Sequence, residues 1–214
     1  MRDTAVLHRF KDGYTIGARS LASRSIVGLA RTRVTPNALT AAGVTLCLAA
    51  SVLVFLENRN AWLFYWAGAA VFVVGSVLDI LDGALARVGG KTTPFGAFLD
   101  STTDRIGEGA MLAAIALVFS RHGHQVALAV TFAAVAGSFL VSYTRARAEA
   151  LGLRGDVGIG SRAERVVVIT AGLVLAPISI WLLVGAISLL TATAWLTVVQ
   201  RILHVRRQLR ARSS

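Results

Sequence analysis

The chain has 214 residues, of which 55% are hydrophobic and 15% are charged, and its mean hydropathy is +0.67. This composition excludes an ordinary soluble domain and indicates an all-α polytopic membrane protein. The net charge of +11 could point to nucleic acid, but the positive charges cluster at the ends of apolar stretches, which favours anionic membrane lipids as partners. We therefore expect no nucleic-acid binding.

The N-terminal segment 1–36 mixes apolar residues with arginine and lysine. This pattern predicts an amphipathic juxtamembrane helix that lies in the headgroup plane on the cytoplasmic side, with a solvated tail as the alternative. Pro36 should end this segment and start the first membrane span.

Residues 37–205 are expected to form a domain of six transmembrane helices. The first four spans are predicted over 37–56, 61–87, 95–120 and 125–150, each about 30 Å or more of helix. Residues 166–200 carry no charge and are long enough for two short spans, with the turn at Pro177 and Ser179 or, alternatively, at Gly185. Both termini then lie in the cytoplasm, residues 206–214 form a basic tail, and all but Arg59 and Arg121 of the 22 lysines and arginines fall on that side of the cell membrane.

Four aspartates stand in the stretch 79–104, where the flanking sequence is apolar. Asp79 and Asp82 are spaced i, i+3 on one predicted helix, and Gly96, Asp100 and Asp104 are spaced i, i+4 on the next, so each group lines one helix face. A carboxylate at bilayer depth costs roughly 2.5 kcal/mol or more, so four of them indicate a functional site. One or two divalent cations would hold them ionised, and the absence of His and Cys from the stretch favours Mg²⁺ or Mn²⁺ over zinc.

These residues carry a family resemblance. The pattern Asp79-x2-Asp82-Gly83-x2-Ala86-Arg87-x8-Gly96-x3-Asp100-x3-Asp104 matches the signature of the CDP-alcohol phosphotransferase family, and the resemblance extends over about residues 35–205. It implies a membrane enzyme, dimeric in the family, in which an alcohol displaces CMP from a CDP-linked lipid with the help of two metal ions.

The resemblance also implies residue roles. Positions matching Asp79, Asp82 and Asp100 hold the metals, and Asp104 reaches one metal and serves as the general base. Glu108, which is outside the signature, is expected to be a buried polar residue bonded within the bundle, with a catalytic role as the alternative. The residues implied to neighbour the CDP-lipid are Asn37, Thr40, Gly83, Arg87, Thr93 and Gly96.

A second informative stretch, 142–165, contains five arginines around a glycine-rich loop. Positive-inside bias would explain some of them, but an acceptor alcohol that bears a phosphate would need an anion pocket here. The run resembles the corresponding region of actinobacterial phosphatidylinositol phosphate synthases, which join inositol phosphate to CDP-diacylglycerol. In that subfamily the acceptor phosphate is bound at positions matching Ser142, Arg145, Arg165 and Arg201, although lysine is frequent where this chain has Arg145.

The sequence therefore leaves three candidate functions, of which two are enzymes of the same family and one is a transporter. The first is a phosphatidylinositol phosphate synthase, and the second is a phosphatidylglycerophosphate synthase that uses glycerol 3-phosphate. An ion or proton-coupled transporter would explain buried acids but not the fixed spacing of glycine and arginine around them.

Overall fold

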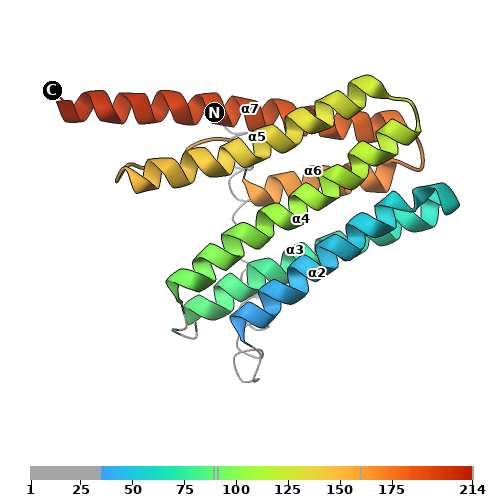
Figure 1. The fold of residues 1–214 in the computed structure, drawn as a ribbon, viewed down its shortest axis with the longest axis horizontal. Coiled ribbons are helices and arrows are strands. Elements are labelled where there is room, and N and C mark those ends of the chain that lie inside the picture. The colour runs from blue at the N-terminus through green and yellow to red at the C-terminus, as the bar shows by residue number, and fades with distance from the viewer. Residues whose placement is uncertain (1–34, 89, 91, 160, 214) are drawn as a thin grey trace, which may run out of the picture.

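The computed structural model describes residues 35–213 apart from 89, 91 and 160. Within this part the chain forms helices only, and no strand (Figure 1). The helices are α2 (Pro36–Phe55), the short 3₁₀ helix η1 (Glu57–Arg59), α3 (Ala61–Val88), α4 (Pro94–Arg121), α5 (Gln125–Ala150), α6 (Arg162–Leu175) and α7 (Ile180–Ser213). The amphipathic segment predicted over 1–36 lies outside the described residues except for its last two, and the predicted basic tail continues α7 without a break.

Prolines and caps set the helix boundaries. Pro36 and Pro94 stand in the first turns of α2 and α4, where a missing N–H costs nothing. Each follows a threonine whose hydroxyl caps the helix, and the Thr93 Oγ1 accepts a hydrogen bond of 3.0 Å from the amide of Gly96. Pro177 lies in the turn between α6 and α7, which confirms the predicted turn there.

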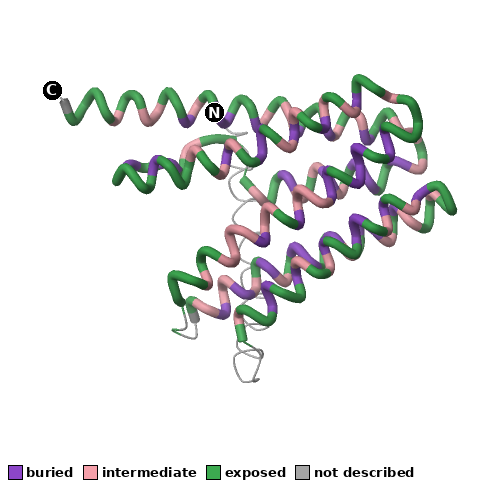
Figure 2. The backbone as a smooth tube through the Cα atoms, viewed as in Figure 1, coloured by how far each residue is buried: buried purple, intermediate pink, exposed green. Residues whose placement is uncertain are grey.

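The helices pack as two groups that meet along the middle of the protein. Helix α2 packs against α3 and α4, and α7 packs against α5 and α6, while contacts of α4 with α5 and of α3 with α6 join the two groups (Figure 1). The residues of the core lie on the inward helix faces (Figure 2) and include Phe72, Met111, Phe119, Leu173 and Ile187.

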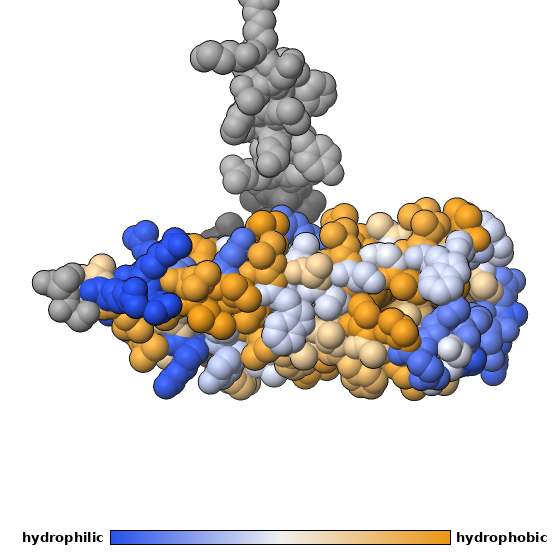
Figure 3. Space-filling view, turned by 90° about the horizontal axis from the view of Figure 1, so that it is seen from above, coloured by the Kyte–Doolittle hydropathy of each residue, from blue (hydrophilic) through white to orange (hydrophobic). Residues whose placement is uncertain are grey.

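The outer surface identifies a membrane protein. Large apolar side chains such as Leu63, Phe132, Val167 and Ile178 are at least 60% exposed, which a water-facing surface of this extent would not tolerate. Figure 3 shows hydrophobic residues along the middle of the molecule and hydrophilic residues gathered at both ends. Four helical stretches are long and apolar enough to cross a membrane: Pro36–Arg59, Ala61–Arg87, Gln125–Ala150 and Ile180–Arg212.

Helices α4 and α6 differ from those four. Helix α4 has 28 residues, but several acidic and basic side chains occupy its first half. Helix α6 has 14 residues and is therefore about 21 Å long.

Close backbone contact between α2 and α3 positions the aspartates. A Cβ atom on Gly75 would lie 2.9 Å from both the carbonyl oxygen of Gly43 and the Sγ of Cys47. Only glycine allows two helices to approach this closely. As a result Thr40, one turn before Gly43, reaches the side chain of Asp82 on α3.

Candidate active site

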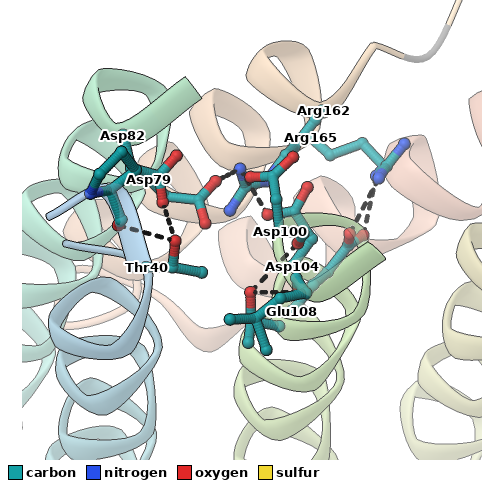
Figure 4. Close-up of polar contacts among 11 residues, drawn as sticks. Thr40, Asp79, Asp82, Asp100, Asp104, Glu108, Arg162 and Arg165 are labelled. Carbon is teal, nitrogen blue, oxygen red and sulfur yellow. Dashed lines mark hydrogen bonds and ion pairs between the residues drawn. The ribbon is translucent and has the colours of Figure 1, made fainter. Parts of the chain in front are cut away.

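The carboxylates come from two helices that the loop between α3 and α4 folds together. Asp79 and Asp82 lie near the end of α3 and are 5% and 2% exposed, while Asp100 lies in the second turn of α4 and is half-buried. One oxygen from each of these three carboxylates lies within 4.8 Å of the others (Figure 4). The three side chains that the sequence predicted as metal ligands therefore do lie together, because the loop folds the two helix faces toward each other.

This group has the chemistry of a divalent-metal site. Thr40 donates a hydrogen bond of 2.5 Å to Oδ2 of Asp82, but Oδ1 of Asp82 is buried and has no hydrogen-bond partner among the described residues. A buried, unpartnered carboxylate oxygen beside two other carboxylates is strongly unfavourable unless a cation binds there. Oxygen ligands of this kind suit Mg²⁺ and Mn²⁺, so the residues fit the metal that the sequence predicted.

Asp104 lies one turn further along α4 and is not part of the group of three. Its Oδ1 lies 2.6 Å from Nη1 of Arg162, the first residue of α6, and the same nitrogen also pairs with Oδ2 of Asp79 (Figure 4). The structure thus separates a three-carboxylate cluster from a fourth carboxylate that an arginine holds beside it. The sequence prediction assigned Asp104 both as a ligand and as the base, and its position next to the cluster is compatible with the second role.

Glu108 is bonded within the bundle, as predicted. Its two carboxylate oxygens accept hydrogen bonds of 2.8 and 2.9 Å from Nε and Nη2 of Arg165, in the bidentate geometry that suits an arginine–carboxylate pair. Both side chains are about nine-tenths buried.

The residues predicted for the CDP-lipid line one cavity. It has a volume of about 150 Å³, and Asp82 and Asp100 form part of its wall. A Cβ on Gly96 would lie 3.1 Å from the Thr93 hydroxyl, so glycine keeps this wall open. All six predicted residues take part: Asn37, Thr40, Gly83, Arg87, Thr93 and Gly96.

Two of the four residues predicted for the acceptor phosphate lie in a second, larger groove. This groove, of about 770 Å³, is bordered by α4 and α5 and is lined by Ser142 and Arg145 together with Asp100 and Asp104. The Nε of Arg145 donates a hydrogen bond of 2.9 Å to Glu149, which holds the guanidinium at the groove.

The other two predicted acceptor residues do not line this groove. Arg165 is engaged by Glu108, and Arg201 donates to the carbonyl oxygens of Val157, at 2.8 Å, and of Val141. Arg201 thereby ties the loop between α5 and α6 to α7. A direct contact of either arginine with the acceptor phosphate stays a prediction.

Arg162 is the site residue that sequence reasoning missed. It is one of the five arginines of the 142–165 stretch, and no sequence-based prediction links it to the aspartates. The spacing did contain a signal: Arg162 and Arg165 are three residues apart and Asp104 and Glu108 are four apart, so each pair lies on one helix face and the two pairs can meet as ion pairs between α6 and α4.

The protein is helical, has an apolar membrane-type surface and holds a cluster of three aspartates beside two cavities. Residues 33–203 match the family of CDP-alcohol phosphatidyltransferases, and the chain is a member of this family of transferases.

Individual relatives have more particular names. Archaetidylinositol phosphate synthase of Pyrococcus horikoshii is 38% identical over 182 residues, which cover 85% of this chain and 88% of the relative. Phosphatidylinositol phosphate synthase of Mycolicibacterium smegmatis is 36% identical over 82% of this chain and 79% of the relative.

Solved structures agree with these sequence relatives. Phosphatidylinositol phosphate synthase of Mycobacterium tuberculosis with CDP-DAG bound superposes with a TM-score of 0.76 at 32% identity, over 87% of this chain and 94% of that one. The same enzyme in complex with manganese and citrate also gives a TM-score of 0.76, at 33% identity, over 86% of this chain and 88% of that one. The manganese complex is consistent with a divalent-metal site at the aspartate cluster.

Proposed function

We propose that this protein transfers the phosphatidyl group of CDP-diacylglycerol to inositol phosphate, releasing CMP and forming phosphatidylinositol phosphate. The observation that carries the proposal is the position of Asp100, which lines both the CDP-side cavity and the arginine-lined groove. A carboxylate cluster between two cavities can serve a reaction in which groups from both sides meet at one phosphorus. The names of the relatives support inositol phosphate as the acceptor.

The residues of the chain then have the following tasks. The CDP-side cavity holds the nucleotide, and Arg87 at its rim pairs with a phosphate oxygen. Asp79, Asp82 and Asp100 would hold the metal, for which we propose two ions, Mg²⁺ or Mn²⁺. When bound, a divalent ion neutralises the diphosphate oxygens and so lowers the barrier to attack by a nucleophile.

The groove binds the second substrate, and Asp104 accepts its proton. Ser142 and Arg145 bind the phosphate of inositol phosphate, which directs a ring hydroxyl toward Asp104 on the opposite side of the groove. Asp104 accepts the hydroxyl proton as the oxygen attacks the phosphorus that bears diacylglycerol. A new P–O bond forms, the P–O bond to CMP breaks, and CMP leaves with the electron pair.

The same proposal includes the arrangement in the membrane. We infer six crossings by α2 to α7, with both termini and the aspartate cluster on the cytoplasmic side of the cell membrane and the 1–36 segment on its surface. Figure 1 supports this arrangement, because the α2–α3, α4–α5 and α6–α7 turns lie at one end of the bundle and the α3–α4 and α5–α6 connections lie toward the other. Assembly as a homodimer is part of the proposal through the family resemblance.

The direct test is release of CMP by the purified full-length protein in detergent. We expect CMP release from CDP-diacylglycerol with inositol phosphate, loss of activity with a chelator, and recovery with Mg²⁺ or Mn²⁺. Turnover with glycerol 3-phosphate but not with inositol phosphate would instead identify the phosphatidylglycerophosphate reaction. Because archaetidylinositol phosphate synthases are about as similar as the bacterial enzymes, CDP-archaeol should be compared as donor.

Arg145 tests the acceptor site separately. Replacement by Gln removes a charge-assisted contact worth roughly 1.5–3 kcal/mol, so the KM for inositol phosphate should rise by about one to two powers of ten. Arg145→Lys keeps the charge and should retain most activity. If Arg145→Gln raises the KM for both substrates equally, the residue does not bind the acceptor.

A further inference from the structure

Arg162 occupies an unusual place for a basic residue. It is the first residue of α6, which begins with a capping box in which Ser161 and Glu164 satisfy each other's backbone amides. The start of a helix is the positive end of its dipole, where a cation is disfavoured. The partners of Arg162 must therefore account for its position, and they are the carboxylates of Asp79 and Asp104.

The ion pairs of Arg162 involve a metal-site carboxylate. Asp79 belongs to the group of three carboxylates that can hold a cation, and it is also one of the two partners of Arg162. The Arg162 side chain is about three-quarters buried, and its guanidinium reaches carboxylates on both α3 and α4 (Figure 4). In this position its single charge compensates two carboxylates that would otherwise repel each other.

We propose that Arg162 is a built-in counter-ion of the aspartate cluster, which a divalent ion displaces from Asp79, while the pair of Arg162 with Asp104 persists and orients that carboxylate. The inference rests on one part of the proposed function, which is that the aspartate cluster binds a divalent metal. Arg162 is a positioning residue in this scheme: it contacts a metal ligand and the base. The guanidinium stabilises the protein before the metal arrives, and it competes with the metal for Asp79.

If Arg162 competes with the metal, removing it should raise the metal affinity, whereas removing a merely supporting residue should lower it. An arginine that only braced the site would weaken metal binding when it was removed. Arg162→Gln should instead bind Mn²⁺ more tightly than the wild type, by about tenfold or more, since a competing partner of Asp79 and a repelling positive charge are both lost. In chelator the same variant should melt at a lower temperature, because the carboxylates lose their counter-ion, and added Mn²⁺ should raise its melting temperature by more than that of the wild type.

The measurement uses the full-length protein in detergent, with Mn²⁺ binding followed by electron paramagnetic resonance and melting followed by tryptophan fluorescence. Arg105→Gln is the matched control, because it removes a positive charge beside Asp104 in the sequence, and no ion pair joins Arg105 to an aspartate in the described part of the chain. We expect Arg105→Gln to change the Mn²⁺ affinity by less than about threefold, as a charge without direct contact would.

Three outcomes separate this inference from the function itself. If the wild type binds no Mn²⁺, the metal-dependent function fails. If the wild type binds Mn²⁺ and Arg162→Gln binds it equally or more weakly, the function stands and the counter-ion role is overturned. If Arg162→Gln does not fold, Arg162→Lys decides. A lysine ammonium group pairs with two carboxylates less well than the planar guanidinium does, so the Mn²⁺ affinity of this variant should still rise. An unchanged Mn²⁺ affinity would overturn the proposal.

Discussion

Among the single side chains, Asp104 is the one on which the proposed chemistry depends most. It faces the acceptor groove but stands outside the three-carboxylate cluster. Asp104→Asn keeps the shape of the side chain and removes the proton acceptor, so turnover should fall by about 10²–10⁴-fold, while the KM for CDP-diacylglycerol changes little. Steady-state CMP release at varied donor concentration measures both quantities.

Glu108→Gln is the matched control for that variant. Glu108 lies one turn beyond Asp104 on the same helix, but Arg165 binds both of its oxygens. We expect this change to lower the melting temperature with a much smaller effect on turnover. Turnover of Asp104→Asn within a few-fold of the wild type would remove Asp104 from the role of base.

The hydroxyl of Thr40 is expected to matter for stability as well as for the site. Thr40 is 4% exposed and donates to Asp82, which otherwise has one buried oxygen without a partner. Thr40→Val leaves the carboxylate with less support, at a cost of roughly 1–3 kcal/mol in the free energy of unfolding in chelator. Added Mn²⁺ should reduce this difference, because the metal stabilises the same carboxylate.

Thr45→Val provides the comparison in the same helix. Thr45 is exposed, and its hydroxyl donates only to the carbonyl of Ala41 within α2. Its replacement should change the free energy of unfolding by no more than about 0.5 kcal/mol. Equal losses for the two threonine variants would show that the Asp82 contact contributes nothing.

The sequence predicted the three-carboxylate cluster but not its arginine partner, for a physical reason. The spacing within one helix fixes which side chains share a face, so Asp79 and Asp82 could be grouped without knowledge of the fold. The contact of Arg162 depends on the angle and depth at which α6 packs against α3, and on how near this brings its first turn to α4. None of these quantities is encoded in the spacing within one helix.

At the level of helices, the closeness of α2 and α3 is what keeps the site assembled. A Cβ on Gly75 would meet the backbone oxygen of Gly43 at 2.9 Å, and a backbone atom cannot move aside as a flexible side chain can. Gly75→Ala should therefore push the two helices apart, at a cost of roughly 1–3 kcal/mol in stability, and should reduce CMP release because Thr40 moves away from Asp82. Melting temperature and turnover are the two measurements.

Gly185→Ala in α7 is the control for helix glycines. A Cβ at Gly185 would meet nothing within 4 Å, so this change should leave stability unchanged or raise it by a few tenths of a kcal/mol. A loss of equal size in both glycine variants would mean that the close contact between α2 and α3 is not needed.

Helix boundaries were predictable where local chemistry decides them, and less so elsewhere. The three prolines each mark a boundary, at Pro36, Pro94 and Pro177. The uncharged stretch 166–200 does not by itself show where α6 begins, and the capping box of Ser161 and Glu164 starts the helix at Arg162, four residues before that stretch. That early start is what brings Arg162 to the aspartates.

At the scale of the whole protein, the number of membrane crossings depends on whether α4 and α6 cross. The other four helices satisfy the requirements of length and hydropathy for a span. Helix α4 carries Asp100, Asp104, Arg105 and Glu108, and α6 has only 14 residues, so neither is among those four helices. The alternation of connections between the two ends of the bundle nevertheless favours six crossings (Figure 1).

The number of crossings can be tested with single cysteines in a Cys47→Ala background, since Cys47 is the only cysteine and is buried. Asn58 lies in η1, Asp156 in the α5–α6 loop and Ile178 in the α6–α7 turn, and all three are exposed. With six crossings, a membrane-impermeant maleimide should label Asn58→Cys and Ile178→Cys in intact cells.

Asp156→Cys should react only after permeabilisation, because three crossings separate residue 156 from residue 58 and one separates it from residue 178. Each alternative topology gives a different pattern. If α4 does not cross, residues 58 and 156 react from the same side, and if α6 does not cross, residues 156 and 178 do so. Labelling of Asp156→Cys alone in intact cells would reverse the orientation, and the aspartate cluster would then lie on the outer side, which contradicts the proposed arrangement in the membrane.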